Sequence, residues 1–115
     1  MESFTEERRI RHRVEAAISI QIQGVDSTGH AYNDAATALE LSRRGLSFLT
    51  RHELALLASL MIVIPGLGPT RSALGPSDFF TEAAVVRTSK EDEEFNRIGV
   101  RFIGATLPMY SAEGV

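Results

Sequence analysis

The chain has 115 residues, the usual length of one domain, with 43% hydrophobic and 23% charged residues and a net charge of −3 at pH 7. This acidic balance argues against a general nucleic-acid binder, which should be basic over a whole face, and the absence of cysteine excludes disulfides and thiolate chemistry. The N-terminus is charged from Glu2 onward, and the longest apolar stretch, 57–64, is far shorter than the roughly 20 residues that span a bilayer. We therefore expect a cytoplasmic protein with no membrane insertion.

The first feature along the chain is a charged segment, 1–13, that carries no apolar face and that we expect to be flexible. It contains four closely spaced arginines, and two more follow at Arg43 and Arg44. Positive charge in two short places suits a small anionic ligand better than a polymer. On composition alone, a solvated charge run balanced by nearby glutamates is the simpler interpretation. The four arginines of the segment are Arg8, Arg9, Arg11 and Arg13.

Residues 16–25 show the alternation of a half-buried strand, because three isoleucines alternate with the polar residues Ser19, Gln21 and Gln23. The next four residues, "DSTG", predict a turn in which Asp26 accepts hydrogen bonds from neighbouring backbone and Gly29 takes a positive φ. The isoleucines are Ile18, Ile20 and Ile22.

Two further strands are predicted at 35–41 and 46–50, joined by the tight polar connection "SRRG". Strict alternation in the first of them places one set of side chains on each face of the strand. The two sets are Thr37, Leu39 and Leu41 on one side, and Ala36, Ala38 and Glu40 on the other.

The second half of the chain begins with an ambiguous stretch, 52–60, whose leucines recur at helical spacing, so that one or two helical turns are expected there. An apolar strand follows and ends at Pro65, which cannot donate to a sheet ladder. The remaining elements are a long loop at 65–78, a strand at 79–89, a charged turn at 90–94 and a strand at 96–105.

This count of about six short strands predicts an all-β protein, a six-stranded antiparallel barrel with at most one short helix. The predicted division is a flexible N-terminal segment at 1–13, the barrel at 14–104 and a C-terminal tail at 105–115.

Catalytic and metal-binding patterns are not found. The histidines, His12, His30 and His52, stand far apart without further ligands, and Ser42 lacks the glycine of a nucleophile elbow. The stretch 66–71, "GLGPTR", lacks the third glycine of a dinucleotide-binding turn and any βαβ context. We therefore expect no enzyme, no metal and no cofactor.

What remains is the arginine cluster together with "ELSRRG". Arginine binds phosphate with two parallel hydrogen bonds and stacks on flat rings, while a hydroxyl, backbone amides and a glycine suit an anion. An Arg-x-x-x-Arg motif (Arg9, Arg13) before the first strand, followed by "ELSRRG" (Glu40, Ser42, Gly45) between two strands, resembles the signature of the PilZ domain family. The resemblance extends over residues 8 to about 104 and includes "AAVVR" and "IGVRF".

The resemblance implies a β-barrel that binds the bacterial second messenger cyclic di-GMP and signals to a partner protein. Because segment 1–13 is highly charged and has no apolar face to bury, we expect ligand binding to order it, and this ordering to carry the signal. It implies that Arg9 and Arg13 hold phosphate and stack on guanine, that Glu40 bonds the guanine edge, and that Ser42 and Gly45 shape the phosphate pocket. Arg8 matches a position that the family associates with binding of a stacked ligand dimer.

Glu40 departs from the family pattern, which has Asp or Asn at this position. The extra methylene moves the carboxylate outward by about 1.5 Å, whereas hydrogen-bond geometry tolerates a few tenths. The alternative is therefore a degenerate PilZ-like domain that does not bind the nucleotide and acts as a protein-interaction adaptor.

Overall fold

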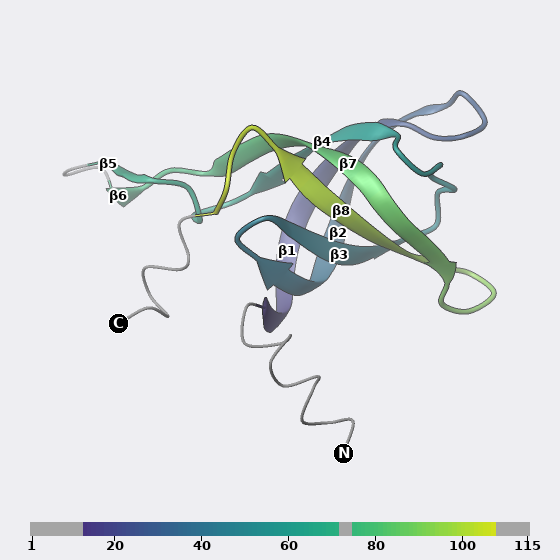
Figure 1. Cartoon of the computed structure of the whole chain (residues 1–115), viewed down its shortest axis with the longest axis horizontal. Helices are drawn as coiled ribbons and strands as arrows, with labels where there is room; N and C mark the ends of the chain where they lie inside the picture. Colours follow the sequence, from purple (N-terminus) through teal and green to yellow (C-terminus); the bar gives the residue numbers. More distant parts are fainter. Residues whose placement is uncertain (1–12, 72–74, 108–115) are drawn as a thin grey trace, which may run out of the picture.

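The computed structural model describes residues 13–71 and 75–107 and contains a closed antiparallel β-barrel, with strand order β1-β2-β3-β8-β7-β4 (Figure 1). Closure comes from β1, which pairs with both β2 and β4. The described ranges contain no helix, and hence none that is long and apolar enough to cross a membrane. The predicted six-stranded barrel is confirmed. Its strands are β1 (Arg13–Val25), β2 (Ala31–Ser42), β3 (Gly45–Thr50), β4 (Ser59–Ile64), β7 (Phe79–Lys90) and β8 (Asn96–Ile103).

The core fills the inside of the barrel with side chains from alternate strand positions. In β1, Ile20 and Ile22 are buried while Gln21 and Gln23 are exposed, as their alternation predicts. Burying each large apolar side chain contributes roughly 1.5–3 kcal/mol, so this packing dominates the stability of the barrel. The largest fully buried side chains are Phe48, Ile22, Ile62, Ile64, Ile98, Leu107 and Val85.

The turn predicted between the first two strands is also confirmed. The Asp26 carboxylate accepts hydrogen bonds from the Thr28 amide at 3.0 Å, the Thr28 hydroxyl at 2.7 Å and the His30 amide at 3.0 Å. Gly29 has a φ of 91°, which side chains other than hydrogen strongly disfavour. The Thr28 hydroxyl and the His30 amide together lower the pKa of Asp26 to about 2.

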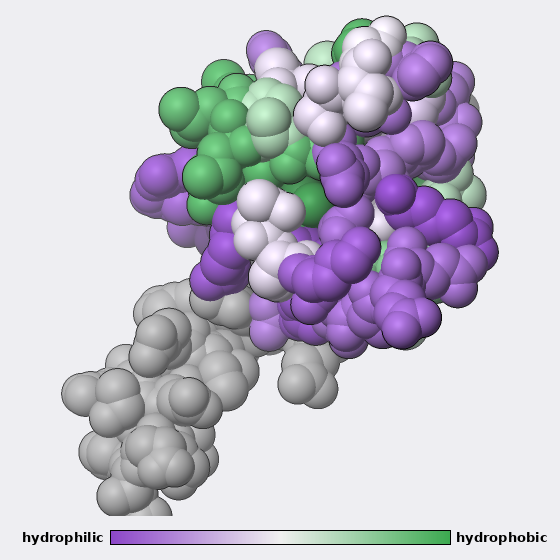
Figure 2. Space-filling model, turned by 90° about the vertical axis from the view of Figure 1, so that its right-hand side faces the viewer, coloured by the Kyte–Doolittle hydropathy of each residue, from purple (hydrophilic) through white to green (hydrophobic). Residues whose placement is uncertain are grey.

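The prediction of helical turns at 52–60 is wrong. Leu54 is buried and Leu57 is 79% exposed, so the two do not share one face. Leu57 has a φ of 71°, and its amide donates to the Val85 carbonyl at 2.7 Å, which continues the pairing of β4 with β7. Figure 2 shows a hydrophobic area on the surface at one side of the molecule, which is otherwise largely hydrophilic. The exposed large apolar side chains include Leu56, Leu57 and Val86.

The strict alternation expected at 35–41 is wrong because β2 contains a bulge. Pairing with β3 runs from Ala38 opposite Phe48 to Glu40 opposite Ser47, which leaves Leu39 as an extra residue. The extra residue resets the inside–outside order, so that both Ala38 and Leu41 are buried.

The long loop expected at 65–78 contains a small second sheet, formed by β5 (Thr70–Arg71) and β6 (Gly75–Pro76). This pair extends away from the barrel (Figure 1). Its base is closed by two backbone hydrogen bonds, from the Gly68 amide to the Ser77 carbonyl at 2.7 Å and from the Ser77 amide to the Pro69 carbonyl at 3.0 Å. Two-residue strands are too short to give a periodic signal in the sequence.

Candidate functional site

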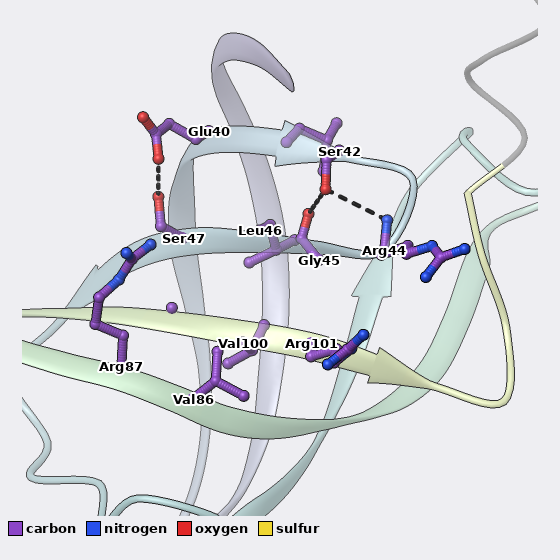
Figure 3. A pocket seen from close by; sticks show the side chains of 12 residues that line it. Glu40, Ser42, Arg44, Gly45, Leu46, Ser47, Val86, Arg87, Val100 and Arg101 are labelled. Atoms are coloured by element: carbon purple, nitrogen blue, oxygen red, sulfur yellow. Dashed lines mark hydrogen bonds between the residues drawn. The ribbon is translucent and has the colours of Figure 1, made fainter. Parts of the chain in front are cut away.

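A cavity of about 290 Å³ lies on the outer surface of the barrel, where β2, β3, β7 and β8 run side by side (Figure 3). It is the place where the second motif meets the two C-terminal strands. Its lining residues are Glu40, Leu41, Ser42, Arg44, Gly45, Leu46, Ser47, Val86, Arg87, Gly99, Val100 and Arg101.

Strand register aligns one row of polar positions across this surface. Glu40 of β2 pairs with Ser47 of β3, Ser47 with Gly99 of β8, and Gly99 with Arg87 of β7. Because Gly99 has no side chain, the Arg87 side chain lies over it: a β-carbon at Gly99 would lie 3.4–3.7 Å from three Arg87 atoms. Bulges flank both ends of the row, at Leu39 and between Val85 and Arg87. Bulges redirect neighbouring side chains and are common beside binding sites.

The "SRRG" turn forms the second edge of the cavity. The Ser42 hydroxyl donates to the Gly45 carbonyl at 3.2 Å and accepts from the Arg44 amide at 3.3 Å, which fixes the turn (Figure 3). Gly45 pairs with Arg101 of β8 so closely that a β-carbon would lie 2.1 Å from the Val100 carbonyl oxygen. The glycine is therefore required by the contact between two strands, independently of any ligand.

The Glu40 side chain points out of the barrel, as expected, and lines the cavity. Its Oε1 accepts from the Ser47 hydroxyl at 3.5 Å and lies 3.9 Å from Nη2 of Arg97. The carboxylate thus contacts two neighbouring strands in the structure.

Two arginines of the described residues lie beside carboxylates. Arg51 is ion-paired with Glu94, and Arg97 lies near Glu40 and Glu91. Three others, Arg44, Arg87 and Arg101, form no ion pair within residues 13–71 and 75–107, and all three line the cavity. The cavity thus holds three arginines and one carboxylate, Glu40, which is a local excess of positive charge in a protein with a net charge of −3.

The structure brings together three of the six candidate residues predicted from sequence: Glu40, Ser42 and Gly45 all line the cavity. The backbone of Arg13 pairs with Ser42, so the chain joins β1 beside this site. Arg8 and Arg9 lie outside the described residues. Sequence reasoning did not assign Ser47, Arg44, Arg87, Gly99 and Arg101 to the site, although "AAVVR" and "IGVRF" had been noted as shared segments.

A second polar cluster lies at the other end of β2. His52 stacks on Tyr32 with ring centroids 4.7 Å apart, and its Nε2 lies 2.5 Å from an Asp34 carboxylate oxygen. Burial, with the nearby charges of Asp26 and Asp34, raises the pKa of Tyr32 to about 12. Among the residues whose side chains are described, no cluster of histidine, aspartate and glutamate has the arrangement needed to hold a metal ion. This cluster joins the 51–58 segment to the β1–β2 turn.

Comparison with known proteins adds a family and a set of related folds. The family model for the PilZ domain matches residues 7–111. The structure of the Bacillus subtilis inhibitor of motility (MotI/DgrA) aligns with a TM-score of 0.57 and 18% identity, covering 81% of this chain and 41% of that protein. The complex of K. pneumonia MrkH with c-di-GMP aligns with a TM-score of 0.51 and 14% identity, covering 79% of this chain and 42% of that protein. The chain thus spans less than half the length of these structures. No curated protein sequence matches it significantly.

Proposed function

The chain belongs to the PilZ domain family, and on this basis we propose that it is a receptor for cyclic di-GMP. PilZ domains are receptor and adaptor modules, so we assign no catalytic role to any residue. The nucleotide named for MrkH supports the choice of ligand.

The observation that carries the proposal is the composition of the outer cavity. Residues of the second motif meet three arginines that lack ion-pair partners in the described part of the chain. Cyclic di-GMP carries two phosphates and two flat guanine rings, and arginine recognises both features. The three arginines of the cavity therefore provide positive charge that can bind a small dianion.

The proposed roles follow from position. We assign the phosphate contacts to the Ser42 hydroxyl and the backbone of the turn. Arg87 lies over Gly99 beside Val86 and offers a surface on which a guanine ring can stack. We assign Arg9 and Arg13 to the phosphates and guanine rings because the Arg13 backbone, at the start of β1, pairs with Ser42. In this proposal their binding orders segment 1–13 and passes the signal to a partner protein.

The alternative is an adaptor that does not bind the nucleotide, and one observation favours it. The Glu40 carboxylate contacts Ser47 and lies near Arg97. A guanine edge would have to compete with these contacts for the carboxylate, and the negative charge would repel the phosphates.

Calorimetric titration with cyclic di-GMP tests the proposal. We expect a dissociation constant in the micromolar range, which corresponds to a binding free energy of about −8 kcal/mol. Arg9→Ala and Arg13→Ala should each weaken this binding free energy by about 2–4 kcal/mol. Arg51→Ala is the matched control, because Arg51 is ion-paired with Glu94 and does not line the cavity. Absence of heat at millimolar ligand would contradict the receptor function. Equal losses of affinity in all three variants would mean that binding comes from nonspecific electrostatic attraction and that the assigned site is wrong.

Glu40 variants separate the receptor from the adaptor. If the protein is a receptor with a tolerated substitution, Glu40→Asp and Glu40→Asn should keep or improve affinity, by up to about 1–1.5 kcal/mol, the value of one net hydrogen bond. If it is an adaptor, the same changes should raise binding from undetectable to measurable. A loss above tenfold in both variants would mean that Glu40 itself is a specific ligand contact.

A further inference from the structure

The cavity described above adjoins a second one of similar size. This second cavity, about 290 Å³, is lined by residues of the β2–β3 turn, of β8 and of the segment that follows β8. The two cavities share Arg44 and Arg101. The lining residues of the second cavity are Arg44, Arg101, Phe102, Gly104, Ala105 and Thr106.

Backbone contacts fix Arg44 and Arg101 as neighbours. Arg101 pairs with Gly45, the residue after Arg44, and the Phe102 amide donates to the Arg44 carbonyl at 2.7 Å. Figure 3 shows both side chains at the same end of the first cavity, beyond Gly45. Because both residues line both cavities, the arginine pair stands at the boundary between the cavities.

The boundary is held in place from the C-terminal side. The Leu107 amide donates to the Arg43 carbonyl at 2.9 Å, and the Leu107 side chain is fully buried. The segment 104–107 is thus packed against the turn, and the second cavity is part of the folded barrel.

Two arginines that border the same cavity and have no carboxylate partner can both donate charge-assisted hydrogen bonds to an anion that lies between them. Neither Arg44 nor Arg101 has an ion-pair partner in the part of the chain that the structure describes. The chemistry of the pair therefore fits a phosphate group.

Size points the same way. Small-molecule sites usually occupy about 300–1,000 Å³, and the first cavity alone lies at the lower limit of this range. A ligand made of two nucleotides needs more room than that, and the adjoining cavity supplies it.

We infer that the ligand spans both cavities, with one phosphate held between Arg44 and Arg101, two residues outside the Arg-x-x-x-Arg and Glu-x-Ser-x-x-Gly positions. The inference rests on the proposed function and extends the site to residues 104–106. It makes the arginine pair a determinant of affinity for ligands with two phosphates.

Titration of single variants with cyclic di-GMP tests the arginine pair. Arg44→Ala and Arg101→Ala should each weaken binding about 10- to 100-fold, the loss of a charge-assisted contact. Arg51→Ala, which removes the same charge at a distance from both cavities, should stay within twofold of the wild type. Thermal melting of each variant in the absence of ligand shows whether it is folded.

A second pair of variants tests the second cavity. Thr106→Glu places a carboxylate beside the arginine pair and should weaken binding at least tenfold, whereas Gln23→Glu makes the same charge change on β1 and should have little effect. The amides of 104–106 should also shift in NMR spectra on addition of ligand.

The outcomes separate the inference from the function. Wild-type binding with Arg44→Ala, Arg101→Ala and Thr106→Glu all within twofold of the controls would overturn the inference and leave the receptor function standing. Ligand-induced shifts confined to residues 40–47 and 99 would do the same. Wild-type protein that gives no heat at millimolar ligand would remove the proposed function and the inference with it.

Discussion

Replacing Gly45 by alanine is expected to destabilise the barrel even in the absence of ligand. A β-carbon at this position would lie 2.1 Å from the Val100 oxygen, 3.2 Å from the Val100 carbonyl carbon and 3.3 Å from the Arg101 α-carbon. All three atoms belong to the backbone of β8 and cannot rotate away, so β3 and β8 must separate. The cause is space, because Gly45 is not among the glycines with positive φ.

The separation should cost one or two ladder hydrogen bonds, about 1 kcal/mol each, and overpacking strain of about 1–3 kcal/mol. We expect a loss of about 2–5 kcal/mol in the free energy of unfolding, or roughly 8–20 °C in Tm. Urea unfolding of ligand-free protein measures it.

Gly99→Ala is the matched control. Its β-carbon would meet only the flexible Arg87 side chain, at 3.4 Å or more, so the stability should be kept or slightly raised. If Gly45→Ala unfolded within 0.5 kcal/mol of the wild type, about the scatter of a neutral substitution, the strand-contact argument would be refuted, and the glycine would serve the ligand alone.

Three further predictions concern stability. Phe48→Ala should cost about 3–5 kcal/mol in urea unfolding because Phe48 is fully buried, while Phe80→Ala, at a side chain 61% exposed, should cost far less; equal losses would contradict the assigned core. Because the pKa of Tyr32 is raised from 10.0 to about 12, the folded state should lose stability as the pH rises from about 10 to about 12, and Tyr32→Phe should remove most of this loss in unfolding measured against pH. Because the pKa of Asp26 is lowered from 3.8 to about 2, its stabilisation of the β1–β2 turn should be present above about pH 4 and lost as the pH falls toward 2; an acid melting curve for Asp26→Ala that ran parallel to that of the wild type would argue against this.

The strands that could be predicted from sequence are those with one buried face. Isoleucines at 18, 20 and 22 alternate without interruption, and Ile98, Val100 and Phe102 do the same at the other end of the barrel. Such a pattern follows directly from the two-residue period of a strand. The "DSTG" turn could also be predicted from the sequence, because its hydrogen bonds join residues at most four positions apart.

The errors arose where local spacing and tertiary pairing disagree. Leucines spaced as on a helix at 52–60 lie largely in an irregular segment with a turn at 56–57, where Leu57 and Ala58 hydrogen-bond to Val85 of β7. The bulge at Leu39 depends on the register with β3, which no local pattern encodes.

The candidate site divides in the same way. Glu40, Ser42 and Gly45 belong to one short motif and could be nominated together. Arg87 and Arg101 join them only through the pairing of β3 with β8 and of β8 with β7, more than 40 residues further along the chain. Each is an ordinary exposed arginine in the sequence, and only the strand register places it in the cavity.

The most direct test of the receptor function is the map of backbone amide shifts in the NMR spectrum during titration with cyclic di-GMP. The account predicts saturable shifts at Gly45, Ser47 and Gly99, which line the cavity, and little change at Thr28 and Gly29 in the turn at the far end of β2. Spectra that remained unchanged at millimolar ligand, or shifts centred on the β1–β2 turn, would contradict it.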